Sequence, residues 1–199
     1  MPEVVLSSAR FTEAPVAWPN TQYSGFDGLA IRIANDFARE LGPQFKADRY
    51  GFRLMHHLAA QPWDELAGLQ VWTGEPLLPP VLVTLEEYAA MGDAAQTADL
   101  LGHSDDPGLG IDKTSIEHPA LGRGARYARR AKQRRGLFGS TVRHEVRWVW
   151  RVGGSHDVVV TFVRDDPNEF ERILPDVEQL VASARLYGQP LPAEGSEPG

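Results

Sequence analysis

The stretch Thr141–Val152, TVRHEVRWVWRV, decides the class of fold. Apolar side chains recur at its even-numbered positions, and charged side chains dominate the odd-numbered ones. An alternation of period two over this length predicts a β-strand with one buried face. We expect the buried face to carry Val142, His144, Val146, Trp148 and Trp150, and the solvated face to carry Arg143, Glu145, Arg147, Val149 and Arg151.

The residues that follow predict a hairpin and a helix packed against it. Gly153–His156 has the composition of a tight turn, and Asp157–Val163 is a second β-branched run, so the two runs should form antiparallel strands. Asp166-Pro167-Asn168-Glu169 then supplies a capping carboxylate, a proline at the first helical position and a glutamate able to reach back to the cap. The helix should place Phe170, Leu174, Val177 and Val181 on the strand's apolar face, with Pro175 kinking or splitting it.

This packing predicts how two neighbouring residues respond to truncation. Trp148→Ala should cost about 3 to 5 kcal/mol, because it empties part of the core. Arg147→Ala, on the solvated face, should cost less than about 0.5 kcal/mol.

Earlier segments are shorter and more often interrupted by glycine and proline. Val4–Phe11 and Val81–Leu85 are compatible with strands, and the apolar spacing over Gly28–Leu41 predicts a helix capped by Asp27 and ended by Gly42. Tyr50–Ala60 fits either a strand turning into a helix or one short helix. Alanine and leucine predict a helix over Glu86–Leu101, and Gly102–Pro119 has the composition of a loop.

Together these elements predict an α+β protein, with an antiparallel β-sheet packed by helices in an αβα sandwich. We expect a single domain over residues 1–187 and a disordered tail over 188–199, where proline, glycine and glutamate prevail.

Three segments together carry a resemblance to a known family. They are His118–Arg126 (HPALGRGAR), the hairpin Val142–Val163, and the helix from Asp166-Pro167 to LVASARL at 180–186. This pattern resembles the C-terminal half of PsbP-like proteins, in particular the actinobacterial LpqN-type proteins of that fold. The resemblance implies an αβα sandwich and a family of partner-binding accessory proteins rather than enzymes.

Composition narrows the function classes. The 199 residues include no cysteine, which excludes thiol nucleophiles and thiolate metal sites. The N-terminus has neither a basic region nor an apolar run typical of a signal peptide, and no segment has the apolar length of a membrane span, so we expect a cytoplasmic protein without a membrane partner. A net charge of −7 disfavours general binding of nucleic acids.

No motif predicts catalysis, a metal or a cofactor. The adjacent His56 and His57 point in different directions on either a helix or a strand, and His103, Asp105 and Asp106 lie together only in a glycine-rich segment. Neither a serine nucleophile elbow nor a phosphate-binding loop is present. We therefore expect a non-enzymatic protein; a dispersed catalytic site around His144 and His156 is the alternative.

A run of basic residues is the strongest candidate for a binding surface. Residues 123–135 contain seven basic residues and no acid, and three arginines follow on the next strand. The simplest interpretation is a solvated face; the functional one is a site for an acidic partner protein or, as the alternative, for nucleic acid. Few aromatic residues that could stack on bases lie between the basic ones, which favours a protein over a nucleic acid as the partner. The candidate residues are Arg123, Arg126, Arg129, Arg130, Lys132, Arg134, Arg135, Arg143, Arg147 and Arg151.

Overall fold

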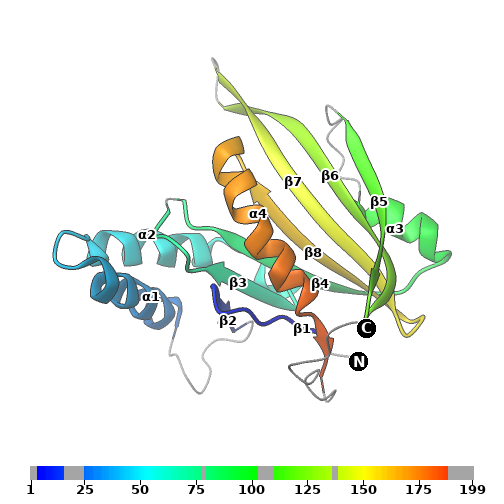
Figure 1. The fold of residues 1–199 in the computed structure, drawn as a ribbon, viewed down its shortest axis with the longest axis horizontal. Coiled ribbons are helices and arrows are strands. Elements are labelled where there is room, and N and C mark those ends of the chain that lie inside the picture. The colour runs from blue at the N-terminus through cyan, green and yellow to red at the C-terminus, as the bar shows by residue number, and fades with distance from the viewer. Residues whose placement is uncertain (1–3, 16–24, 78, 103–109, 136–138, 188–199) are drawn as a thin grey trace, which may run out of the picture.

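The computed structural model describes residues 4–15, 25–77, 79–102, 110–135 and 139–187. Its centre is an antiparallel sheet of seven strands in the order β2-β3-β4-β8-β7-β6-β5 (Figure 1). The strands are β2 (Phe11–Ala14), β3 (Gly68–Trp72), β4 (Leu82–Ala89), β5 (Ile111–His118), β6 (Gly122–Arg135), β7 (Gly139–Val152) and β8 (His156–Arg164). Two short strands, β1 (Val4–Val5) and β9 (Arg185–Leu186), pair separately.

One face of the sheet is covered by helix α4 (Pro167–Ala182), which crosses in front of β7 and β8 in Figure 1. The main core lies between them, and it joins Val146, Trp148 and Trp150 of β7 to Phe170, Val177 and Val181 of α4. Leu174 packs against this core at its margin. The predicted contact between strand and helix is therefore confirmed, and His144, 8% exposed, is also buried.

The opposite face is covered at two places. Helices α1 (Phe26–Leu41) and α2 (Ala47–Ala59) pack on β2 and β3 and enclose a second core around Leu29, Leu54 and Leu69. Helix α3 (Ala94–Gly102) covers the other end through Ala98 and Leu101, which pack on Ala125, Tyr127 and Val149. Helices on both faces of an antiparallel sheet confirm the predicted α+β sandwich.

From His144 to Val152, strand β7 is largely buried on both faces, which corrects the expectation of one solvated face. On the side of α3, Val149 is 1% exposed and Glu145 is 3% exposed. The alternation of charged and apolar residues predicted that the charged face is exposed to solvent. Instead, helix α3 covers this face, and oppositely charged neighbours compensate its charges.

Several element boundaries also differ from expectation. The predicted helix over Glu86–Leu101 is wrong in its first part, because β4 continues to Ala89 through pairing with β8, and α3 begins at Ala94. The predicted loop over Gly102–Pro119 contains strand β5, which pairs with β6, while residues 103–109 lie outside the described parts. In place of the single strand predicted over Val4–Phe11, the structure has the two short strands β1 and β2. Of the two alternatives for Tyr50–Ala60, the structure shows the helix, α2.

Helix ends follow the sequence signals in part. Gly42 ends α1 with a positive φ of 78°, and Asp166 caps α4 by accepting hydrogen bonds from the backbone N–H groups of Asn168 and Glu169 at 2.8 and 3.1 Å. Asp27 lies in the first turn of α1 rather than at its cap. Glu169 binds Arg164 at 2.8 Å instead of reaching back to the cap. Pro175 lies within a single helix.

Candidate functional site

The strand register divides the ten candidate basic residues between the two faces of the sheet. Arg126 and Arg130 lie opposite Trp148 and His144, so they share the face covered by α4. The remaining described side chains occupy the α3 face: Arg123, Arg129, Arg143, Arg147 and Arg151. Lys132, Arg134 and Arg135 have a described backbone in β6, but their side chains lie outside the described part.

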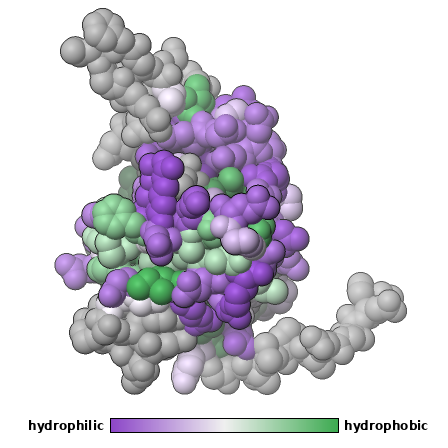
Figure 2. Space-filling model, turned by 90° about the vertical axis from the view of Figure 1, so that its left-hand side faces the viewer, coloured by the Kyte–Doolittle hydropathy of each residue, from purple (hydrophilic) through white to green (hydrophobic). Residues whose placement is uncertain are grey.

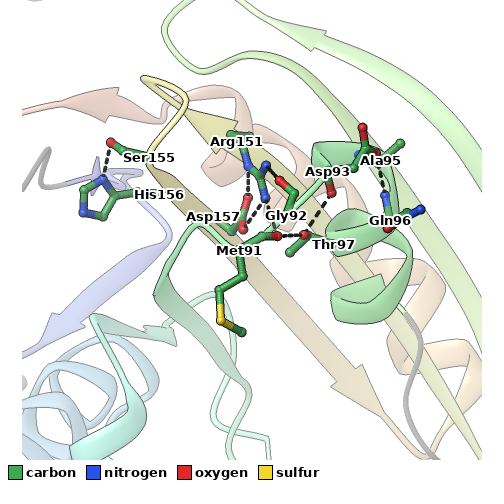
Figure 3. A network of polar contacts seen from close by, with 10 residues as sticks. All are labelled: Met91, Gly92, Asp93, Ala95, Gln96, Thr97, Arg151, Ser155, His156 and Asp157. Atoms are coloured by element: carbon green, nitrogen blue, oxygen red, sulfur yellow. Dashed lines mark hydrogen bonds and ion pairs between the residues drawn. The ribbon is translucent and has the colours of Figure 1, made fainter.

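Arg151 fixes the chain that leads into α3. Its guanidinium donates two hydrogen bonds of 2.8 Å to the carboxylate of Asp157, which is 2% exposed (Figure 3). A third hydrogen bond of 2.8 Å reaches the carbonyl oxygen of Gly92, just before α3. The hydrogen bond with Asp157 raises the pKa of Arg151, which keeps the guanidinium charged. Arg151 is therefore committed to an internal contact.

Beneath helix α3, Glu145 accepts hydrogen bonds from two further arginines. Arg129 donates to one carboxylate oxygen from Nε at 3.1 Å and from Nη2 at 2.6 Å, and Arg147 donates to the other at 2.5 Å. Arg147 also donates to the carbonyl oxygen of Leu101, near the end of α3, at 2.8 Å. The carboxylate of Glu145 compensates the charges of both arginines. Few of their N–H groups remain available to an external ligand.

The polar contacts of α3 extend to the neighbouring strands. The Tyr127 hydroxyl donates to the Asp99 carboxylate at 2.8 Å, and Lys113 also pairs with Asp99. Burial, followed by this hydrogen bond, raises the pKa of Tyr127, so the hydroxyl remains a donor. The expectation of an open basic face is thus corrected for Arg129, Arg147 and Arg151; partner binding by them stays a prediction.

Of the other described arginines, Arg123, Arg130 and Arg143 are more accessible, and Arg126 is half-buried. Arg123 and Arg130 are exposed, and Arg130 forms no ion pair with any described residue. The Arg143 side chain, 40% exposed, lies 3.8 Å from Asp165. Arg126 pairs with Glu178 at 3.2 Å and lies over the Trp148 ring, while its buried Nε has no hydrogen-bond partner in the described chain.

The accessible basic positions continue onto a part of the sheet that extends past its neighbours. Pairing of β5 with β6 stops at Arg129, and pairing of β8 with β7 stops at His144. Among the described residues, β6 and β7 alone pair beyond these points, as far as Arg135 with Gly139, and they reach past the other strands in Figure 1. We call residues 130–135 and 139–143 the ribbon. At about 3.3 Å per residue it is about 20 Å long.

A groove opens at the root of the ribbon on the α4 side. Its volume is about 540 Å³, and it lies between α4 and strands β5 to β7. The walls combine apolar and basic side chains: Ala128, Phe170, Leu174, Arg126, Arg130 and His144. Asp112 and Glu171, both exposed, also line it, as do Gly110 and the paired residues Arg129 and Glu145.

Two smaller hollows lie elsewhere. One of about 370 Å³ is lined by Thr12 of β2 and by Phe37 and Glu40 of α1. The other, of about 170 Å³, lies between α1 and α2 beside the exposed Ile31 and Phe52. Figure 2 views this end of the molecule and shows apolar side chains bordered by hydrophilic ones.

The described residues contain no group of three or more histidine, aspartate or glutamate side chains arranged to hold a metal ion. His103, Asp105 and Asp106 lie outside those residues. The described helices include none with the length and apolar character needed to cross a membrane. His144 and His156 lie at opposite ends of the β7–β8 hairpin, about 26 Å apart along the strand, so the fold does not bring them together.

Sequence reasoning missed the contribution of α3, beneath which three of the ten candidate basic residues form internal contacts: Arg129, Arg147 and Arg151. A signal for this helix was present at Asp93, whose carboxylate accepts hydrogen bonds from the backbone N–H groups of Ala95 and Gln96 at 2.9 and 3.1 Å. An aspartate followed three residues later by glutamine is a typical helix start. The groove had no sequence signal, because its residues come from β5, β6, β7 and α4.

Comparison with known proteins bears on the fold. No protein-family model matches the chain, and no curated protein matches it. Among solved structures, the chain is similar to LpqN of Mycobacterium tuberculosis, a protein described as involved in cell envelope biogenesis. The two share 12% sequence identity over 60% of this chain and 70% of that chain, with a TM-score of 0.42. LpqN is of the type that the sequence resembles.

Proposed function

We propose that the chain is a non-enzymatic accessory protein that binds an acidic segment of a partner protein in the cytoplasm, using the ribbon. One observation carries the proposal: β6 and β7 run past the ends of both neighbouring strands, and this projecting part is basic. It contains five basic residues and no acidic one, in a chain whose net charge is −7. They are Arg130, Lys132, Arg134, Arg135 and Arg143.

The geometry of the ribbon favours an extended peptide as the ligand. Each of its strands has one edge without a neighbour among the described strands. The backbone N–H and C=O groups of an open edge can pair with an added strand. Basic side chains beside such an edge attract a strand that carries carboxylates. Backbone pairing would supply affinity, and charge would select an acidic sequence.

Nucleic acid is the second candidate, because a two-stranded ribbon is narrow enough to enter the major groove of a DNA duplex. Against it, the described ribbon residues include no aromatic side chain for stacking on bases. The acidic remainder of the chain would also repel phosphates. Protein is therefore the partner that we favour.

The test is titration by fluorescence anisotropy with three labelled ligands at low salt. The first is a short peptide of alternating glutamate and valine, the second is the same peptide with alternate backbone nitrogens methylated, and the third is a short DNA duplex. We expect the first peptide to bind, and the methylated one to bind about tenfold more weakly because it lacks backbone donors. Tighter binding of the duplex, with steep salt dependence, would replace this proposal by the nucleic-acid alternative.

A pair of charge-matched variants locates the site. The ribbon variant changes one lysine and three arginines to glutamate: Arg130, Lys132, Arg134 and Arg135. The control makes the same change in charge at four exposed positions outside the ribbon: Lys46, Arg49, Arg53 and Arg123. We expect the ribbon variant to lose at least about tenfold in peptide affinity and to lose more than the control. Equal losses in the two variants, or no binding by the unmodified chain, would overturn the proposal.

A further inference from the structure

A largely buried histidine that forms no hydrogen bond with the described residues lines the groove at the root of the ribbon. His144 is 8% exposed and lines the groove. Its ring packs against that of Phe170, with the centroids 5.4 Å apart, and no hydrogen bond joins it to any described residue. Its ring nitrogens are not sealed from solvent, so they open onto the hollow, where a ligand atom can reach them.

The neighbours of His144 favour a ligand that is negatively charged. In the register of the sheet, His144 lies between Arg130 of β6 and Arg164 of β8. Arg164 is compensated by Glu169, whose carboxylate lies 2.6 Å from its guanidinium. Arg130 has no ion pair among the described residues. The strand side of the groove therefore combines an imidazole and a guanidinium that can both donate to an anion.

The opposite wall supplies an apolar contact. Phe170 and Leu174 of α4 face the strand residue Ala128 across the groove, and the small Ala128 side chain leaves room between helix and sheet. The volume of about 540 Å³ lies in the range of small-molecule sites. Three acidic residues also line the groove. Glu145 is already paired with Arg129 and Arg147, and Asp112 and Glu171 are exposed, so water screens their charge.

We propose that this groove binds a small organic anion, with a flat apolar body between Phe170, Leu174 and Ala128 and a carboxylate or phosphate group between Arg130 and His144. The site is distinct from the strand edges of the ribbon and does not depend on the binding of a partner protein. It shares only Arg130 with the ribbon, whereas His144 belongs to the groove alone.

The experiment uses benzoate and phenyl phosphate as probes, with benzyl alcohol as the neutral counterpart. Saturation-transfer NMR on the ligands gives affinities, and shifts of the histidine ring protons give the location. The chain has six histidines, so the signal that disappears in His144→Phe identifies His144. We expect one or both anions to bind and to move the His144 signal, and the alcohol to bind at least about tenfold more weakly. Comparing the two anions identifies the preferred acidic group.

Three variants of the full chain decide the assignment. His144→Phe keeps a ring against Phe170 and removes both nitrogen atoms, and Arg130→Gln removes the free guanidinium; each should weaken anion binding about tenfold. Arg123→Gln, at an exposed position on the opposite face, should leave it unchanged. Absence of binding, equal binding of the alcohol, or full binding by His144→Phe would overturn the proposal. None of these results would affect peptide binding by the ribbon.

Discussion

The two faces of strand β7 carry different kinds of buried side chains. On the side of α4, Val146, Trp148 and Trp150 join an apolar core that extends across the sheet. On the side of α3, a few apolar residues lie beside charged groups that are almost as well buried, including Glu145 and Asp157. An apolar face is stabilised by burial alone, whereas a charged face requires every group to meet its counterpart.

The difference suggests separate roles for the two faces. Arg129 of β6 meets Glu145 of β7 in one register only. A slip of β7 by one residue would turn Glu145 toward the apolar core and leave Arg129 without its carboxylate, while Arg147, on the same strand, would turn with Glu145 and lose the Leu101 carbonyl oxygen. We infer that the apolar face supplies most of the stability, and that the charged face fixes the register and the position of α3.

Trp148→Ala tests the apolar face and should have the largest effect. The side chain is 3% exposed and lies within the main core, so its removal leaves a cavity beneath α4. We expect a loss of about 3 to 5 kcal/mol in the free energy of unfolding, measured by urea denaturation. Leu100→Ala, an apolar truncation at a residue 76% exposed on α3, is the control and should cost less than about 0.5 kcal/mol. Similar losses in the two variants would show that the α4 face is not the main source of stability.

Glu145→Gln tests the charged face with almost no change in shape. The substitution leaves two arginines facing a neutral amide, one of them with a side chain only 6% exposed. We expect a loss of about 2 to 4 kcal/mol by the same measurement, because breaking a buried ion pair leaves uncompensated charge. Glu178→Gln makes the same chemical change in the more exposed pair with Arg126 and should cost less than about 1 kcal/mol. A Glu145→Gln variant as stable as Glu178→Gln would contradict the role given to the charged face.

The apolar face could be predicted from the sequence, and the charged face could not. The period-two pattern of residues 141–152 and the apolar spacing of α4 each identify a surface, and two apolar surfaces so close in the chain pack together. The sequence pattern Arg143, Glu145, Arg147 would be the same on a strand face exposed to solvent and on one covered by a helix. Its burial depends on α3, whose docking depends in turn on Arg147 and Arg151.

The remaining errors have the same origin in tertiary contacts. Residues 86–89, which resemble a helix start, are held in β4 by pairing with β8. Strand β5 lies at the sheet edge, where polar residues such as Asp112 and Lys113 weaken the apolar alternation. Of the candidate site, the sequence revealed the concentration of basic residues. The ribbon follows from where β5 and β8 end, which no local pattern encodes.

Arg147→Ala should have the smallest measurable effect, and it separates the structural view of β7 from the sequence-based one. A solvated Arg147 would cost less than about 0.5 kcal/mol to truncate. In the structure, truncation removes a hydrogen bond to the Leu101 carbonyl oxygen and one of the two arginines that compensate Glu145, while Arg129 remains in place. We therefore expect a loss of about 1 to 2 kcal/mol, together with faster amide hydrogen exchange in α3, where the Leu101 contact is lost. Arg130→Ala, at an exposed position without an ion pair among the described residues, should leave both quantities unchanged. If the two variants behave alike, the charged face is solvated after all, and Arg147 becomes available to the partner.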